Sequence, residues 1–293
     1  MRYSPYLFIA PFFVLFGVFG MFPLLFNAVV SLRTWKLDDP SANGWAGFDN
    51  YRRLLTDSDW WNALENTVGI MLLSSIPQLL LALWLASLLN RKLRARTFLR
   101  VAVLLPYITP IAASTLVFGA VFAKDFGVVN WLLSIVHVGP IDWRADKWSS
   151  WIAISAMVDW RWIGYNTLIY LAAMQVVPRD LYEAASIDGA GQWRQFVRIT
   201  VPLIRPTILF TVVLSTIGGM QLFTEPLLFD NNLSNATGGS TGQFQTVALM
   251  VYKVGWKDLN LGYAAALSWA IFLIIILFAS VNSYLTTRKW GRS

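Results

Sequence analysis

The hydrophobic residues of this chain gather into six long runs instead of alternating with polar positions. About 20 mostly apolar residues are needed to cross roughly 30 Å of hydrocarbon as a helix. The runs that meet this length cover residues 6–32, 67–89, 101–122, 151–177, 203–223 and 263–285. We therefore predict an all-α membrane protein with six transmembrane helices, in a single domain that spans residues 1–293.

Two of these runs need a further argument. The first is too long for the apolar part of a signal peptide, and no small-residue cleavage site follows it. The third carries Pro106 and Pro110, which would break a water-exposed helix. Inside a helical bundle, neighbouring side chains can satisfy the carbonyl groups that proline frees, so we treat this run as one span.

The composition fits a bilayer as the solvent. Of the 293 residues, 56% are hydrophobic and 13% are charged, whereas soluble domains carry about 25% charged residues. Fifteen Trp and ten Tyr suit the aromatic belts at membrane surfaces. The chain has no cysteine and one histidine, His137. This excludes disulfides, thiolate metal sites and metal centres built from several histidines.

The charged residues are sorted between the two ends of the predicted helices. The loops at one end hold 13 Lys or Arg and 3 Asp or Glu, and those at the other end hold 10 and 13. One side is therefore net +10 and the other −3, which accounts for the net charge of +7. Because basic loops stay in the cytoplasm, we predict that both termini are cytoplasmic. The positive charge then needs no nucleic-acid partner.

The cytoplasmic segment at residues 178–202 has more internal pattern than a linker. Pro178 suits the first turn of a helix, and Glu183 lies near the positive end of that helix. Gly189–Gly191 interrupts it, and a second, amphipathic helix runs on to Pro202. We expect a helix–turn–helix elbow at the inner membrane surface. Amphipathicity alone would favour two helices that only rest on lipid headgroups.

The elbow also carries a specific residue pattern. It consists of Glu183-Ala184-Ala185, Asp188-Gly189-Ala190, Phe196, Ile199, Pro202 and Pro206. This pattern resembles the EAA motif of permease subunits of binding-protein-dependent ABC importers. Similarity to that family extends to Phe48-Asp49-Asn50-Tyr51, Asn66-Thr67, Arg100, Leu105-Pro106, Trp160, Gly164 and Leu171-Ala172. The chain is most similar to the carbohydrate-uptake branch, the relatives of the maltose-type first permease, although it has no room for that subunit's inserted outer domain.

The resemblance implies a type I permease fold whose coupling helix, at about residues 179–191, fits a cleft on an ATPase subunit. It implies that Glu183 makes a polar contact with the ATPase and that Gly189 lets the chain turn sharply. It also implies that Trp193 and Phe196 anchor the second helix to the bundle. The ATPase-coupling residues carried over in this way are Glu183, Ala184, Ala185, Asp188, Gly189, Ala190, Trp193, Phe196 and Pro202.

The resemblance implies partners as well. The chain contains no Gly-x4-Gly-Lys-Ser/Thr sequence, so we expect no enzyme activity, no metal and no cofactor in this chain, with ATP and Mg²⁺ on separate subunits. The expected assembly is a heterodimer with a second, homologous permease, joined by two ATP-binding cassette ATPase subunits and an extracytoplasmic solute-binding protein or lipoprotein. The chain would be a multi-pass protein of the bacterial inner (cytoplasmic) membrane, in contact with the lipid bilayer and with no nucleic acid.

Polar residues inside the predicted spans are costly in lipid and are therefore candidates for a substrate path. Steps of seven and four residues put three of them on one face of the fourth span: Asp159, Asn166 and Tyr170. The fifth span and its outer end add Ser215, Gly218, Gly219, Gln221 and Glu225. The alternative for each is a bond between packed helices, which we favour for the group of Ser74, Ser75 and Gln78 in the second span.

A di- or oligosaccharide is the cargo that the resemblance and these side chains favour, because aromatic, amide and carboxylate groups suit sugar faces and hydroxyls. Glycerol-3-phosphate or another polyol is the alternative, since importers of those solutes share the permease pattern. A membrane-embedded enzyme or a channel is a more distant alternative. The chain has no paired intramembrane carboxylates for an enzyme, and a channel would leave the elbow unexplained.

One outer segment has the look of a phosphate-binding loop. Residues 237–242 read Thr-Gly-Gly-Ser-Thr-Gly. The segment lacks the Gly-Lys-Ser/Thr ending that would hold a phosphate. We expect a flexible outer loop there.

Overall fold

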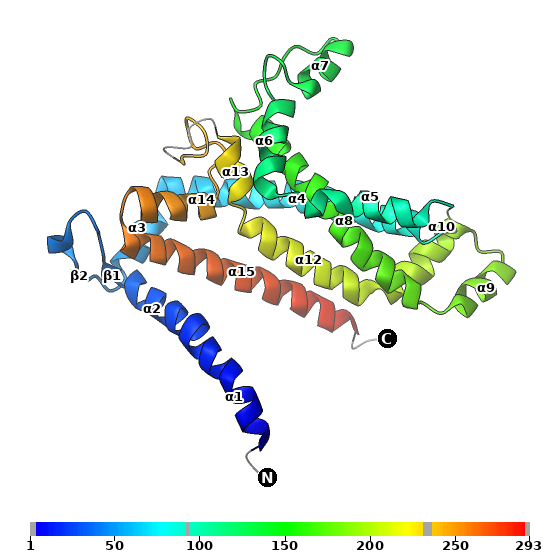
Figure 1. The fold of residues 1–293 in the computed structure, drawn as a ribbon, viewed down its shortest axis with the longest axis horizontal. Helices are drawn as coiled ribbons and strands as arrows, with labels where there is room; N and C mark the ends of the chain where they lie inside the picture. The colour runs from blue at the N-terminus through cyan, green and yellow to red at the C-terminus, as the bar shows by residue number, and fades with distance from the viewer. Residues whose placement is uncertain (1–3, 92–93, 231–235, 291–293) are drawn as a thin grey trace.

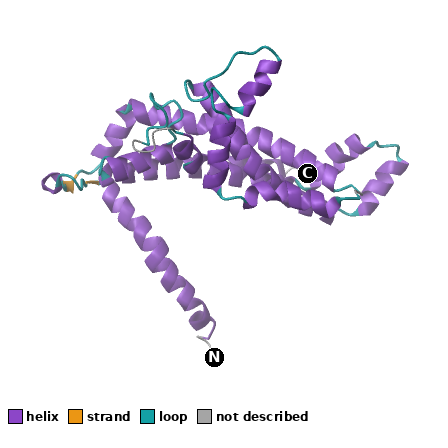
Figure 2. Ribbon diagram, turned by 45° about the horizontal axis from the view of Figure 1, so that its top comes forward, coloured by secondary structure: helices purple, strands orange, loops and turns teal. Residues whose placement is uncertain are grey.

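The chain folds into a bundle of long helices with short elements at both ends (Figure 1; Figure 2). The computed structural model describes residues 4–91, 94–230 and 236–290. The termini that the charge pattern places in the cytoplasm, residues 1–3 and 291–293, lie outside the described residues. Within the described part, helices α4, α8, α12 and α15 pack along one another and form the body of the bundle.

The N-terminal helix extends away from that body, as Figure 1 shows in blue. It consists of α1 (Ser4–Phe16), a π-helical turn η1 (Gly17–Met21) and α2 (Phe22–Ser31). Its α2 end packs against α15 (Leu261–Trp290). No residue of its most apolar stretch is buried. This helix therefore presents an apolar surface to lipid or to another protein.

A short corner leads from this helix into the bundle. It comprises the antiparallel strands β1 (Arg33–Thr34) and β2 (Gly44–Trp45), the 3-10 turn η2 (Pro40–Ala42) and the helices α3 (Asp49–Thr56) and α4 (Ser58–Leu89). Asp57 caps α4 by accepting from the Asp59 amide at 3.0 Å. Its other carboxylate oxygen accepts from the Tyr263 hydroxyl at 2.6 Å. One side chain thus ties the start of α4 to the start of α15.

Helix α8 (Lys147–Val176) lies at the centre of the packing. It contacts α4, α5 (Arg96–Ile108), α6 (Ile111–Val121), α12 (Arg205–Met220) and α13 (Thr224–Phe229). Two glycines permit the closest of these contacts. A side chain at Gly69 of α4 would overlap the ring of Trp151, and one at Gly164 of α8 would overlap the carbonyl oxygen of Val103.

The third predicted span is not one continuous helix. Helices α5 and α6 meet at 92°. Thr109, between them, has extended backbone angles, and Pro110 caps α6. Proline disfavours the helical conformation of the residue before it, so the break follows from the Thr109–Pro110 pair. A second bend, of 70°, separates the elbow helices α10 (Gln192–Gln195) and α11 (Val201–Leu203) from α12.

The predicted count of six spans depends on how the bent helices and α8 are assigned. Among the described residues, three helices are long and apolar enough to cross a membrane: Phe8–Ser31, Ser58–Leu89 and Leu261–Asn282. Each bent pair adds one more, which brings the number to five. The 30-residue α8 is long enough, but it carries Asp159, Arg161 and Asn166 and falls outside that set. It would be a sixth span only as a helix covered by protein.

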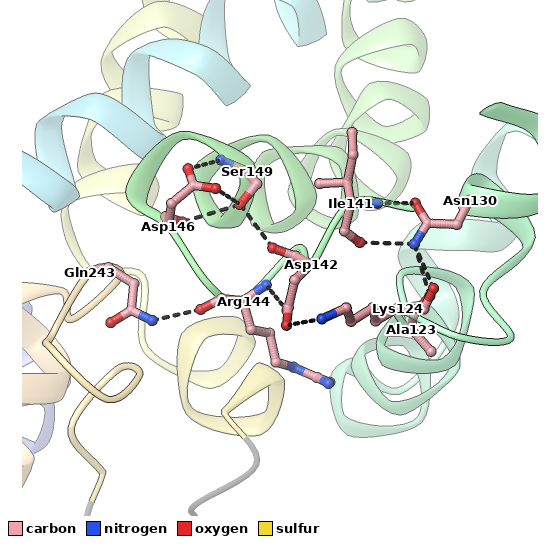
Figure 3. A network of polar contacts seen from close by, with 9 residues as sticks. All are labelled: Ala123, Lys124, Asn130, Ile141, Asp142, Arg144, Asp146, Ser149 and Gln243. Carbon is pink, nitrogen blue, oxygen red and sulfur yellow. Dashed lines mark hydrogen bonds and ion pairs between the residues drawn. The ribbon is translucent and has the colours of Figure 1, made fainter. Parts of the chain in front are cut away.

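Polar contacts fix the loop between α6 and α8, which contains α7 (Val128–Ile135) (Figure 3). The buried Asn130 amide donates to the carbonyl oxygens of Lys124 and Ile141, each at 2.8 Å. Its oxygen accepts from the Ile141 amide and the Trp143 indole. Gln243 donates to the Arg144 carbonyl oxygen at 2.6 Å, which joins this loop to the segment after α13.

The expectation of a flexible loop at residues 237–242 is wrong. Gly238 and Gly239 are buried, and both have positive φ angles. The buried Asn66 amide of α4 donates to the carbonyl oxygens of Gly242 and Gln245 at 2.8 and 3.0 Å. The segment then leads into α14 (Val247–Tyr252) and a π-helical turn η4 (Lys253–Lys257). Glycine is needed here for a tight, held turn and not for mobility.

The substitution Gly164→Ala should destabilise the protein by about 1–3 kcal/mol, because the new methyl group overlaps the backbone of α5. The control is Gly218→Ala, also inside a helix, where a side chain would meet no atom within 4 Å. Thermal unfolding of the two purified variants compares them. Equal unfolding midpoints would contradict the close packing of α5 on α8.

Asp146 should contribute a pH-dependent part of the stability. It caps α8 by accepting from the amides of Ser149 and Trp148. These bonds, the Ser149 amide first, lower the pKa of the Asp146 carboxyl. The stabilisation is therefore present above the unfolded-state pKa of about 3.9 and is lost as the pH falls through the lower folded-state pKa.

Asp146→Ala should lower the free energy of unfolding by about 1 kcal/mol at neutral pH. Asp146→Asn should lower it by only a few tenths of a kcal/mol, because asparagine can still cap the helix. Denaturant unfolding at neutral pH and near pH 3 measures both. The difference between wild type and Asp146→Ala should shrink at the lower pH, and an unchanged difference would rule out the cap as its source.

Candidate functional site

The elbow is built around a sharp turn at Gly189. Helix α9 (Arg179–Ile187) ends there, and Gly189 has a φ of +76°, a conformation that strains other residues. The Gly189 amide donates to the Ser186 carbonyl oxygen at 3.1 Å, and the Ala190 amide donates to that of Ala185 at 2.8 Å. These two bonds make a Schellman cap. The backbone therefore adopts the sharp turn that was expected at Gly189.

Side chains hold the two arms of the elbow together. The Gln195 amide donates to the Ser186 hydroxyl and to the Ala190 carbonyl oxygen, both at 2.9 Å. Further along, the hydroxyls of Tyr182 and Thr200 share a hydrogen bond of 2.8 Å. Thr200 ends the π-helical turn η3 (Phe196–Thr200) that continues α10. The arms are thus braced at both ends, and the elbow forms one unit.

Most residues of the α9 face are open to a partner. Glu183, Ala184 and Asp188 are exposed, and Ala185 and Ala190 are half-buried. Pro202, inside the short helix α11, is exposed as well. This face contains small side chains and the exposed carboxylates of Glu183 and Asp188, so another protein backbone can approach it closely.

The two aromatic residues of the second arm differ from each other. Phe196 packs against the buried cluster that contains Leu171 and Met174. Trp193 touches the Phe196 ring, with centroids 5.7 Å apart, but stays 75% exposed. The expected anchoring role therefore fits Phe196 and is wrong for Trp193. Trp193 instead lines a hollow of about 620 Å³ between the end of α4 and the elbow, together with Trp84, Met174 and Tyr182.

Two of the substrate-path candidates serve helix packing instead. Tyr170 is 1% exposed, and its hydroxyl shares a 2.6 Å hydrogen bond with Thr211, which joins α8 to α12. A side chain at Gly219 would lie 2.6 Å from Met71, so this glycine lets α12 approach α4. For these two residues the alternative of a contact between packed helices describes the structure better than an open path.

Two candidates on α8 keep polar atoms that are buried and unpaired. Within the described residues, one carboxylate oxygen of Asp159 has no hydrogen-bond partner, and neither has the amide nitrogen of Asn166. Asp159 is half-buried and Asn166 is 2% exposed. An unpaired polar atom in a dry interior is costly, so both side chains are suited to meet water, a solute or a partner.

The end of α12 offers an accessible polar face. Gly218 and Gln221 are exposed and Ser215 is half-buried, at steps of three residues along the helix. Nothing lies within 4 Å of a side chain built at Gly218. These three candidates therefore share one open face, separate from the packed face that contains Gly219.

Glu225, the last candidate, is buried against Arg161, a residue that the sequence analysis did not select. Nη1 of Arg161 lies 3.5 Å from Oε1 of Glu225, and the two side chains are 13% and 4% exposed. The pair joins α8 to α13. On the other end of α13, Arg144 donates to the Phe229 carbonyl oxygen at 2.7 Å and stacks over the Phe229 ring. The sequence did offer a signal for this pair, because Arg161 is a lone arginine inside the fourth predicted span and Glu225 lies at the end of the fifth.

Across the described ranges, no three His, Asp or Glu residues are grouped so that they could hold a metal ion. What the arrangement offers is a braced elbow at one end of the bundle and, along α8 and α12, polar groups suited to neutral, hydroxyl-bearing solutes.

Comparison with known proteins agrees on one family. The model of the family described as "binding-protein-dependent transport system inner membrane component" matches residues 78–291. The lactose transport system permease protein LacF of Rhizobium radiobacter is 36% identical over 282 residues, covering 95% of this chain and 92% of its own. The trehalose/maltose transport system permease protein MalF of Thermococcus litoralis is 30% identical over 290 residues, covering 98% and 94%.

Solved structures show the same fold. A chain of a bacterial alginate ABC transporter, in complex with an alginate pentasaccharide-bound periplasmic protein, superposes with a TM-score of 0.80 at 21% identity. The superposition covers 97% of this chain and 93% of that one. The architecture described above is therefore that of an ABC transporter permease.

Removing one member of the Arg161–Glu225 pair should destabilise the protein by about 3–5 kcal/mol, because the other charge is left buried and unpaired. Arg161→Gln and Glu225→Gln test this singly, and the double variant should lose much less than their sum. Unfolding in denaturant measures all three.

The control is the Lys147–Glu65 pair, which is shorter at 2.6 Å but has a glutamate that is 63% exposed. The substitution Glu65→Gln should lower the free energy of unfolding by less than about 1 kcal/mol. Additive losses at Arg161 and Glu225 would show that the two side chains do not depend on each other.

Proposed function

Because the chain belongs to the family of binding-protein-dependent transport system inner membrane components, we propose that it is one of two permease subunits of an ATP-driven importer for a di- or oligosaccharide. The braced, glycine-capped elbow with its open α9 face carries this proposal. The names of the relatives support the cargo: lactose, trehalose and maltose, and arabinooligosaccharides for the permease AraP of Halalkalibacterium halodurans, 33% identical over 285 residues.

The elbow at residues 178–202 is the proposed coupling loop. Glu183, Ala184, Ala185, Asp188, Gly189 and Ala190 form the face that meets an ATPase subunit. ATP and Mg²⁺ are held by two such subunits. Movement of α9 is passed to the bundle through the Tyr182–Thr200 bond and through Phe196, which packs on α8 residues. The 70° bend then leads directly into α12, the helix with the open polar face.

The proposed path runs along polar groups of α8 and α12. Asp159 and Asn166 supply the buried, unpaired atoms, and Ser215, Gly218 and Gln221 supply the open face. Sugar hydroxyls can both donate to and accept from such groups, which suits an uncharged cargo. A second, homologous permease completes the enclosure, since the open face of α12 and the apolar first helix are uncovered in this chain.

The proposed orientation follows the charge pattern. The elbow and both termini face the cytoplasm, and the loop carrying α7 and the segment at 236–246 face outward. An extracytoplasmic solute-binding protein or lipoprotein delivers the sugar at that outer end. The single domain at 1–293 crosses the bacterial inner membrane with α8 as a protein-covered span.

The proposal can be tested with the importer reconstituted in membranes, carrying either Gly189→Asp or Glu183→Ala. Asp at position 189 must adopt a φ of +76° and adds a charge at the turn, so coupling should fail. We expect ATP hydrolysis stimulated by the loaded binding protein, and sugar uptake, to fall by at least about tenfold, while membrane insertion is retained.

Gly191→Ala is the matched control, because Gly191 has an extended backbone and open space around it. It should keep normal stimulated hydrolysis. Normal activity in both Gly189→Asp and Glu183→Ala, or uptake by this chain without ATPase subunits, would contradict the proposed function.

A further inference from the structure

The hollow between the end of α4 and the elbow has one face of α4 as its first wall. Leu80, Trp84, Ser87 and Arg91 line it, and their steps of four, three and four residues place them on the same side of a helix. The helical turn continues to Arg91, whose amide donates to the Leu88 carbonyl oxygen at 3.1 Å. At 1.5 Å per residue, this wall is about 16 Å long.

The second arm of the elbow forms the opposite wall. Trp193, Phe196 and Thr200 line the hollow from α10 and η3, also at helical spacing. The hollow has a volume of about 620 Å³. Trp84 on one wall and Trp193 on the other are 55% and 75% exposed. The described residues therefore leave an open space with an aromatic side chain on each wall.

The lining changes from apolar to polar along α4. Leu80 and Trp84 belong to the candidate membrane span Ser58–Leu89, whereas Asn90 and Arg91 follow directly after the end of that span. The hollow thus extends from the depth of the hydrocarbon to the level of the lipid headgroups. Its occupant needs an apolar part at one end and a polar part at the other.

The polar end is positively charged. Arg91 is the one charged residue among the described residues that line the hollow. It takes part in none of the ion pairs in the described part of the chain. Guanidinium groups match phosphate oxygens well. A sugar would leave the apolar end of the hollow unmatched, whereas a phospholipid with a negative headgroup matches both ends.

We propose that this hollow binds one anionic phospholipid from the leaflet at the elbow end, which is the inner leaflet in the proposed orientation. The phosphate lies at Arg91 and Asn90, and an acyl chain extends along Trp84 toward Leu80. The lipid contacts α4 on one side and the elbow on the other. It therefore holds the second arm against the bundle, in addition to the contacts that Phe196 makes.

Photo-crosslinking identifies the occupant in the importer, reconstituted in membranes with equal amounts of phosphatidylglycerol and phosphatidylcholine. Trp84 is replaced by p-benzoylphenylalanine, and mass spectrometry measures the adducts. The control carries the same replacement at Leu81, which is 44% exposed on the same helix and lies outside the hollow. The ratio of phosphatidylglycerol to phosphatidylcholine adducts should be about fivefold higher at position 84 than at position 81.

The role of the charge is tested in the same preparation. Arg91→Gln should lower the adduct ratio at position 84 to that at position 81. Arg94→Gln is the matched control, because Arg94 is an exposed residue of the same loop that does not line the hollow. It should change the ratio by less than about twofold.

Three results would overturn the proposal. Equal ratios at positions 84 and 81 would show bulk lipid alone, and equal effects of Arg91→Gln and Arg94→Gln would show a diffuse surface charge. Adducts at position 84 with a protein subunit instead of a lipid would assign the hollow to a partner chain. None of these measurements depends on ATP hydrolysis or sugar uptake, so their failure is distinguishable from a failure of the proposed function.

Discussion

The structure depends on how one polar helix is kept out of lipid. Helix α8 is 30 residues long, yet its middle carries Asp159, Arg161 and Asn166. Such groups are costly in hydrocarbon, so this helix must be surrounded by protein. The glycine contacts at Gly69 and Gly164 bring α4 and α5 against it, and the Arg161–Glu225 pair brings α13 over its outer half. The remaining helices take their places around that centre.

The same centre links the two ends of the molecule. At its C-terminal end, α8 leads through Pro178 into an elbow that is closed by a Schellman cap and braced by Gln195 and Tyr182. A force applied to the α9 face therefore reaches the bundle by two routes, through the chain itself into α8 and through the bent connection into α12. At the other end of the bundle, Arg144 holds α13 and Asn66 holds the glycine-rich segment at residues 237–242. This geometry suits a path whose two ends move in turn.

Much of this arrangement was predictable from the order of residues. Long apolar runs locate the helices because lipid selects for them, and Gly189–Gly191 with its flanking residues locates the elbow. Other features depend on contacts between distant segments and were missed. The glycine-rich segment is held at Gly242 by Asn66, which lies far away in sequence. The 92° break, in contrast, follows from the local Thr109–Pro110 pair, and the sequence analysis missed it because it allowed a bundle to cover the carbonyl groups that proline frees. Tyr170 and Gly219 had the right residue type for a path but face neighbouring helices, which helical spacing alone does not reveal.

Solvent accessibility along α8 tests the central claim most directly. The chain has no cysteine, so single cysteines can be introduced by Asp159→Cys and Met157→Cys, two positions at nearly the same depth. Met157 is 1% exposed in the apolar core, whereas Asp159 lies on the proposed path. In the assembled importer, a water-soluble maleimide should label position 159, with protection by the transported sugar, and leave position 157 unlabelled. Equal labelling at the two positions, or none at 159, would contradict a polar path along this helix.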